Sequence, residues 1–249
     1  MNVVTKHTSN FSPISLKNMD GVKLMNRTDT KFAFSVNRIK EIFAKILPYY
    51  DVLEIDDKRI HSYKSLYFDT SDRKFYNDHH NQRVNRHKIR FREYVDSGLT
   101  FLEVKCKTNK GKTVKKRLKV DKISKSLTSE QQQYVNNVIG DSLELMPIQW
   151  INFSRITLVH KVQKERLTLD INLDYSNTNS SGDLRKIIIA EVKQERMSRA
   201  SDFIRTAKEM GIFPMRISKY CFSSMYLDET LKKNRFKEKQ IFINKIIQE

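Results

Sequence analysis

Hydrophobic and charged residues alternate along two neighbouring stretches of this chain, residues 88–92 and 101–107. The charged positions are Lys88, Arg90 and Arg92 in the first stretch, and Glu103, Lys105 and Lys107 in the second. Side chains of a β-strand point alternately to its two faces. Each stretch therefore predicts a strand with one apolar and one mostly cationic face. The turn-forming residues 96–98 lie between them and predict a hairpin.

Four further stretches alternate in the same way. Their polar positions that share one face are Arg27, Asp29 and Lys31; Thr113, Lys115, Arg117 and Lys119; Arg166, Thr168, Asp170 and Asn172; and Glu191 and Lys193. Further strands are predicted at 50–55, 62–68 and 148–162. Apolar residues at helical spacing and helix-ending residues predict helices at 36–47, 72–82, 127–139, 198–210 and 220–232.

The orientation of the cationic faces decides the fold. A solvated, lysine-rich face is ordinary for any single antiparallel strand. The outer helices, however, need an apolar surface to cover, and covering the apolar faces turns the cations inward. We therefore predict an α+β fold in which about eight antiparallel strands form a closed β-barrel with helices packed outside, because closure removes sheet edges and creates an interior. Clustered cations are unstable without a counter-charge, so this interior predicts an anionic ligand.

The composition adds a strong positive charge. The chain has 249 residues, with 47 Lys and Arg against 29 Asp and Glu, and a formal charge of +18. Such an excess attracts anions, so nucleic acid, an anionic membrane and polyphosphate are candidate partners. Cys106 and Cys221 lie in no zinc-binding spacing. We expect a cytoplasmic protein without a signal peptide or a membrane span.

Carboxylates accompany the cations on the same faces. Glu191, with Glu103, Asp170 or Asp29 as helpers, is a candidate ligand set for Mg²⁺ or Mn²⁺, because these ions combine a few carboxylates with phosphate oxygens and water. The alternative is that the carboxylates form salt bridges to neighbouring Lys and Arg. The sequence has no Walker-type phosphate loop. A ring of Arg and Lys would therefore have to hold phosphate groups.

A series of short motifs occurs in a fixed order along the chain. They are the residues at 27–32, 67–70, 88–92, 101–105, 114–117, 154–155, 169–170, 190–193 and 218–220. In this order the motifs resemble the VTC domain, the polyphosphate polymerase branch of the triphosphate tunnel metalloenzyme (CYTH-like) superfamily. With this resemblance we divide the chain into a polar N-terminal lead-in at 1–22, a VTC-like triphosphate tunnel domain at 23–230 and a basic amphipathic C-terminal tail at 231–249.

The resemblance implies roles for individual residues. Those expected to act on the phosphates during catalysis are Lys31, Arg90, Arg92, Lys105, Lys115, Arg155 and Lys219. Further substrate-binding residues, which share faces with them, are Arg27, Lys88, Arg117 and Lys193. Glu191 matches the metal-binding glutamate of the family, with Glu103 and Asp170 as additional metal candidates. Mn²⁺ or Mg²⁺ is the implied cofactor.

The resemblance also implies a function. Related CYTH hydrolases and cyclases carry an ExExK pattern in the first strand, whereas residues 27–31 here contain a single acid. This favours a polyphosphate polymerase that transfers the γ-phosphate of ATP to a growing chain. The alternatives are a tripolyphosphatase or nucleoside triphosphatase in the same tunnel, and a non-catalytic polyanion or RNA binder, with nucleic acid the less favoured partner. The sequence shows neither an SPX domain nor membrane helices, so a membrane part would need a separate partner protein.

Overall fold

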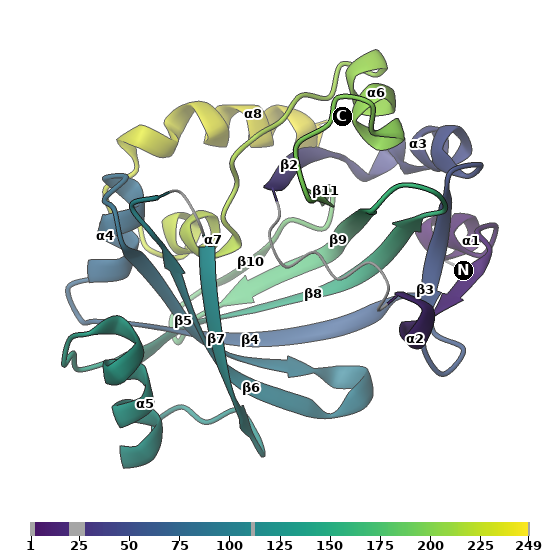
Figure 1. Cartoon of the computed structure of the whole chain (residues 1–249). Helices are drawn as coiled ribbons and strands as arrows, with labels where there is room; N and C mark the ends of the chain where they lie inside the picture. The colour runs from purple at the N-terminus through teal and green to yellow at the C-terminus, as the bar shows by residue number, and fades with distance from the viewer. Residues whose placement is uncertain (1–2, 20–27, 111–112, 249) are drawn as a thin grey trace.

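The computed structural model describes residues 3–19, 28–110 and 113–248. Its strands belong to one sheet (Figure 1). They are β1 (Pro13–Ser15), β2 (Thr28–Ser35), β3 (Tyr50–Glu54), β4 (His61–Asp69), β5 (Arg86–Tyr94), β6 (Leu99–Lys107), β7 (Thr113–Val120), β8 (Met146–His160), β9 (Glu165–Ser176), β10 (Ser181–Asp183) and β11 (Ile187–Gln194). The main path of the sheet is β2-β11-β9-β8-β4-β5-β6-β7, and every pairing along it is antiparallel.

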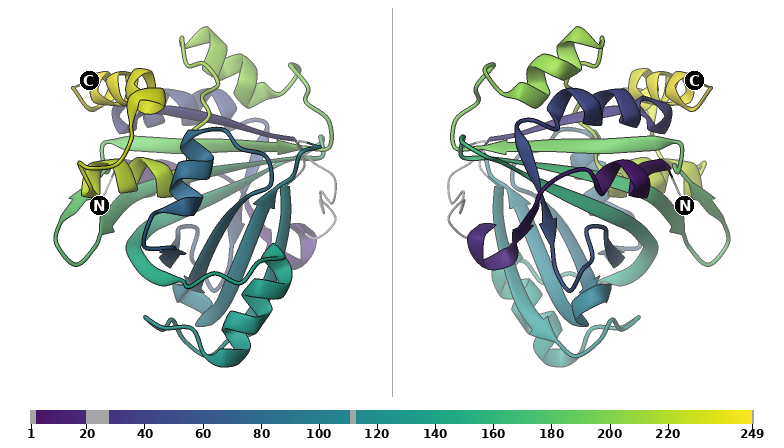
Figure 2. Two further views of the ribbon diagram at one scale, coloured as in Figure 1. Left: turned by 90° about the vertical axis from the view of Figure 1, so that its left-hand side faces the viewer. Right: turned by 90° about the vertical axis from the view of Figure 1, so that its right-hand side faces the viewer.

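The prediction of a closed β-barrel is wrong. The sheet has 11 strands, and no pairing between described residues joins its two end strands, β2 and β7. Most side chains of β7 are exposed, and it carries Lys115, Lys116, Arg117 and Lys119. A charged edge strand resists pairing with another strand. If β7 paired with β2, its lysines would face Lys31, and this repulsion between like charges would be destabilising. Figure 2 shows that the sheet instead curves strongly, with β9 and β11 in one layer and β4 to β7 inclined to it.

Each of the five predicted helical segments contains a helix, and the described residues hold three more, near the two ends of the chain, that were not predicted. They are α1 (Val3–Thr8), α2 (Leu16–Met19), α3 (Ile39–Ile46), α4 (Lys74–His80), α5 (Ser129–Ile139), α6 (Asp202–Glu209), α7 (Lys219–Leu227) and α8 (Lys237–Gln248). Local sequence explains their ends. Thr128 and Gln131 form a reciprocal capping box at the start of α5. Gly211 follows α6 with a positive φ of 71°, a conformation that glycine adopts without strain.

The apolar positions of the alternating strands lie on the outer face of the sheet, as predicted. One cluster joins Phe32, Leu169 and Ile188 to helices α3 and α6. A second joins Phe91 and Leu102 to α4 and α5. In Figure 2, α3 and α6 lie above the layer of β9 and β11, while α5 lies at the opposite end of the molecule. Because both helix groups cover the apolar face, the cationic positions face the concave inner side.

The inner face is divided along the strands into a charged part and an apolar part. Ala33, Ile151, Phe153 and Ile189 have the parity of the charged residues, yet they belong to an apolar cluster with α7 and α8. The last segment, 231–249, contributes Phe236, Ile243 and Ile246 to this cluster, and all three side chains are buried. The first segment, 1–22, contributes strand β1, which pairs with β3 in parallel. Helices α7 and α8 thus cover the apolar part of the inner face.

None of the helices in the described ranges is long and apolar enough to cross a membrane.

Candidate functional site

The strand register places the cations of the inner face in adjacent rows. Lys88 of β5 lies opposite Lys105 of β6, which in turn lies opposite Lys115 of β7. One row further on, Arg90 lies opposite both Glu103 of β6 and Tyr67 of β4. Neighbouring like charges repel, so this arrangement needs internal carboxylates or an external anion.

Glu103 is the centre of the first ion-pair group. Its carboxylate is fully buried and accepts hydrogen bonds from Nε and Nη2 of Arg90 at 2.9 and 2.6 Å. Lys115 forms an ion pair with the same carboxylate. Burial opposes ionisation of Glu103, but Arg90 and Lys115 outweigh it and hold the pKa of the carboxyl below its usual range. Glu103 therefore fixes the position of Arg90, and Arg90 and Lys115 both contact its carboxylate.

Asp170 is the centre of the second ion-pair group. It accepts bonds from Arg155 at 2.6 and 2.9 Å in a bidentate arrangement, and Lys219 at the start of α7 also contacts it. Burial opposes ionisation, but Arg155 and Lys219 outweigh it, so the pKa of Asp170 is depressed. Like Glu103, Asp170 neutralises the charge of the cations that contact it.

Glu191 lies between two lysines on the β2–β11 side of the site. Lys193 lies 3.2 Å and Lys31 3.9 Å from its carboxylate oxygens, and Asp29 is in hydrogen-bonding contact with it. Burial opposes ionisation of Glu191, but Lys193 and Lys31 lower the pKa well below its ordinary value. Lys193 also donates to Thr168 at 3.0 Å. Glu191 and Asp29 are thus two adjacent carboxylates on neighbouring strands.

Other cations of the site have no carboxylate partner within the described chain. Arg92 donates to Ser65 at 3.2 Å and Lys88 donates to Ser218 at 2.8 Å. The side chain of Lys105 forms neither a hydrogen bond nor an ion pair with the described residues. Burial, with Arg90 and Arg92 nearby, depresses the pKa of Lys105 far below its usual value. These unneutralised cations make the inner face a strong binding site for a polyanion.

Aromatic side chains support the arginines of the inner face. Tyr63 and Phe153 stack on each other, with ring centroids 5.1 Å apart. The guanidinium groups of Arg92 and Arg155 each lie 5.3–5.4 Å from these two ring centroids. Such cation–π contacts orient a guanidinium. The rings therefore hold cations in place.

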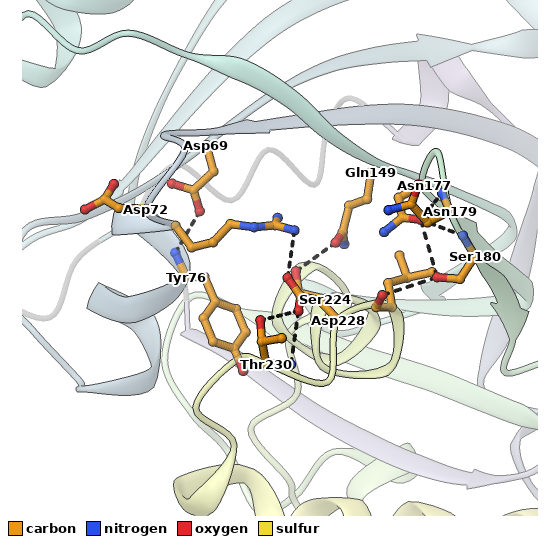
Figure 3. A network of polar contacts seen from close by, with 12 residues as sticks. Asp69, Asp72, Tyr76, Gln149, Asn177, Asn179, Ser180, Ser224, Asp228 and Thr230 are labelled. Atoms are coloured by element: carbon orange, nitrogen blue, oxygen red, sulfur yellow. Dashed lines mark hydrogen bonds and ion pairs between the residues drawn. The ribbon is translucent and has the colours of Figure 1, made fainter.

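Helix α7 brings Ser218 and Lys219 into the site, and polar contacts anchor this helix at its other end (Figure 3). Ser224 donates to Gln149 of β8 at 2.8 Å. Asp228, which follows the helix, pairs with Arg73 at 3.3 Å. Ser218 caps α7 by accepting a bond from Cys221 N. The N-terminus of a capped helix, with its partial positive charge, thereby adds to the positive field of the site.

The structure brings most of the predicted site residues together. Those that lie in the groups just described are Lys31, Lys88, Arg90, Arg92, Lys105, Lys115, Arg155, Lys193, Lys219, Glu103, Asp170 and Glu191. Arg117 lies opposite Glu103 in the register of β6 and β7. Its guanidinium lies 4.7 Å from the ring centroid of Phe101. Arg27 lies outside the described residues. The metal candidates belong to separate ion-pair groups, and no group of three possible ligands exists among the described residues.

Three polar residues of the site, Tyr67, Ser218 and Thr168, were not among the predicted site residues. Thr168 has the parity of Asp170, and Tyr67 that of Tyr63, so their positions on the inner face were readable from the alternation. Ser218 precedes a predicted helix and has the residue type of an N-cap. Its contact with Lys88, 130 residues away, could not be read from the sequence.

The family is established by comparison with known proteins. The VTC domain family matches residues 26–228, so this chain belongs to the VTC domain family. No curated protein gave a significant match.

Comparison with solved structures identifies a protein that shares this fold. A Hippeastrum protein, assigned as a candidate adenylyl cyclase and reported to have a dominant triphosphatase activity, is 16% identical, with a TM-score of 0.52. The match covers 82% of this chain and 97% of that one. A candidate adenylate cyclase from Vibrio parahaemolyticus is 12% identical over 80% of this chain and 99% of its own, with a TM-score of 0.45. At 16% identity, the similarity to the Hippeastrum protein shows a shared fold and nothing about activity.

Two lysines of the site, Lys115 and Lys193, predict an unusual pH dependence of stability. Burial lowers the pKa of Lys115 and of Lys193 to about 8. Lysines of an unfolded chain have a pKa of about 10.4. Between these values the unfolded state binds more protons, so stability rises with pH. We expect the melting temperature of the ligand-free protein to increase from pH 8 to pH 9.5. A decrease over this interval would show that these lysines keep their ordinary pKa.

Proposed function

We propose that this protein is a polyphosphate polymerase that transfers the γ-phosphate of ATP to the end of a polyphosphate chain. The observation that carries the proposal is the excess of inner-face cations over the carboxylates Glu103, Asp170 and Glu191. Membership of the VTC domain family supports it. The Hippeastrum protein, reported to be a triphosphatase, supports the broader proposal that the site handles triphosphates.

The cations bind and align the two reacting phosphates. A terminal oxygen of the chain attacks the γ-phosphorus of ATP, the bond to the β-phosphate oxygen breaks, and ADP leaves. Phosphoryl transfer of this kind needs positioning and neutralisation of charge more than covalent chemistry from the protein. Arg92 and Lys105, which have no carboxylate partner, are the cations most available to phosphate oxygens. Arg90 and Arg155 are held in fixed orientations by Glu103 and Asp170.

The adjacent carboxylates Glu191 and Asp29 fit a divalent cation. Mg²⁺ is commonly held by one or two carboxylates, with phosphate oxygens and water completing its shell. The absence of a three-ligand group among the described residues therefore agrees with an ion that binds together with the triphosphate. Bound Mg²⁺ or Mn²⁺ would neutralise charge on the phosphate oxygens.

A single incubation tests the proposed function. Purified protein with ATP and Mn²⁺ is expected to form long polyphosphate, visible as a ladder of phosphate chains on a sizing gel. A polymer that disappears after chelation of the metal agrees with the proposal. Products limited to orthophosphate or pyrophosphate would instead assign a triphosphatase, in which water replaces the chain end as the nucleophile.

The alternative of an RNA-binding surface is less favoured by the geometry. Base stacking needs accessible aromatic faces. On the inner face, the guanidinium group of Arg92 lies over the rings of Tyr63 and Phe153. The guanidinium group of Arg117 lies over the ring of Phe101. Tyr67 stacks on Tyr220, with ring centroids 5.1 Å apart. The rings that would contact bases are thus already in contact with protein groups.

A further inference from the structure

Tyr67 of β4 has its phenol oxygen inside the cation cluster. Its side chain lies on the inner face and the residue is 4% exposed. Nη1 of Arg90 donates to the phenol oxygen at 2.6 Å. The ring is held from behind by Tyr220 of α7, at an interplanar angle of 16°. Tyr67 therefore has a fixed position next to the arginine that Glu103 orients.

The phenol proton of Tyr67 forms no hydrogen bond to a residue in the described part of the chain. Because Arg90 donates to the oxygen, the O–H of Tyr67 must point elsewhere. The charged groups around it are Arg90, Arg92 and Lys88, and none of these can accept a hydrogen bond. Described hydrogen bonds include none in which Tyr67 is the donor. A buried donor without an acceptor is costly, and the groups around this one attract anions.

We propose that Tyr67 is a phosphate-binding residue whose phenol O–H donates to an oxygen of the bound triphosphate or polyphosphate, beside Arg90 and Arg92. The proposal rests on the proposed function and deepens it, since it adds an uncharged donor to the cations that would bind phosphate. A neutral donor contributes a directional bond without increasing the repulsion among the cations.

The electrostatic surroundings agree with a strong donor. Burial opposes ionisation of the phenol, but Arg90 and Arg92 outweigh it, so the pKa of Tyr67 is below its ordinary value. A more acidic phenol forms a stronger hydrogen bond to an anionic oxygen. Lys88, the third neighbouring cation, acts in the same direction.

The test compares Tyr67→Phe with Tyr76→Phe in the full chain. Tyr76 is also buried in the apolar cluster of α7 and α8, but its hydroxyl donates to the backbone oxygen of Lys232 at 2.8 Å, away from the cations. Binding of inorganic tripolyphosphate is measured by calorimetry at mildly acidic pH. We expect Tyr67→Phe to weaken binding about ten- to a hundredfold, while Tyr76→Phe binds like the unmodified protein. Equal affinity of Tyr67→Phe and the unmodified protein would overturn the proposal.

Two further outcomes separate a direct contact from a positional effect. Site-specific 3-fluorotyrosine at position 67 has a more acidic phenol, which is a better donor and a poorer acceptor. Tighter tripolyphosphate binding by this protein supports donation to phosphate. Weaker binding would mean that Tyr67 acts only as an acceptor for Arg90, and would overturn the proposal. If the unmodified protein itself fails to bind tripolyphosphate, the proposed function fails. If the unmodified protein binds it and Tyr67→Phe binds it equally well, only the role of Tyr67 fails.

Discussion

Replacing Glu191 with glutamine is expected to reduce polyphosphate synthesis about a thousandfold while the fold is retained. The substitution keeps the size of the side chain but removes the negative charge that would hold a divalent cation next to Asp29. Loss of one well-placed electrostatic contribution in a water-excluded site has an effect of this order. The measurement is the initial rate of polymer formation from ATP and Mn²⁺, with a circular dichroism spectrum to verify folding.

The matched control is Glu195→Gln, which makes the same chemical change just beyond the end of β11. Glu195 is largely exposed and forms a surface ion pair with Lys164 at 3.7 Å. Such pairs contribute little to stability. We expect this variant to synthesise polyphosphate at the unmodified rate. If Glu191→Gln also retained its rate, Glu191 would have no role in holding the metal.

Replacing Asp170 with asparagine is expected to cause the largest loss of stability in the ligand-free protein, about 3–5 kcal/mol. The substitution leaves Arg155 and Lys219 buried without the carboxylate that neutralises them. Their mutual repulsion and desolvation would then be uncompensated. The free energy of unfolding from urea titration at pH 7 measures this loss.

The acid dependence of stability provides a second measurement on Asp170. Its folded-state pKa lies below its unfolded value. The stability that it contributes is therefore fully present above about pH 4, the unfolded pKa, and is lost as the pH falls toward the folded pKa. In Asp170→Asn this part of the acid-induced loss should be absent.

Ligand rescue and a matched variant complete this test. Tripolyphosphate would supply negative charge to the unpaired cations, so it should stabilise Asp170→Asn by linkage. Asp174→Asn, four residues along β9, removes a carboxylate that accepts a bond from Asn152 at 2.8 Å. We expect it to cost about 1 kcal/mol without rescue by tripolyphosphate. Equal destabilisation by both variants would show that the carboxylate of Asp170 contributes no more to stability than that of Asp174.

The alternation of residues predicted the faces of the strands because a strand has a fixed period of two. Arg90 and Arg92 lie on the inner face and Phe91 on the outer one for this reason alone. The helix starting at Ser129 was also readable, because Thr128 and Gln131 form its cap within four residues. Local geometry was sufficient in each of these cases.

The alternation of residues does not predict which cation forms an ion pair with which carboxylate. Glu103 and Asp170 were metal candidates by residue type, yet each carboxylate is taken by two cations. Lys219 reaches Asp170 from 49 residues away, on a helix that enters the inner face. No local pattern specifies which of several nearby cations will meet a given carboxylate.

The sequence by itself determined which side chains face inward, and with them the positive charge of the inner face. Only the tertiary structure decided where the sheet ends, which cations keep a carboxylate partner, and that Tyr67 lies among the arginines. The physical reason is the range of the interactions. Face and helix caps depend on residues a few positions apart, whereas strand edges and ion pairs depend on the packing of segments far apart in the chain.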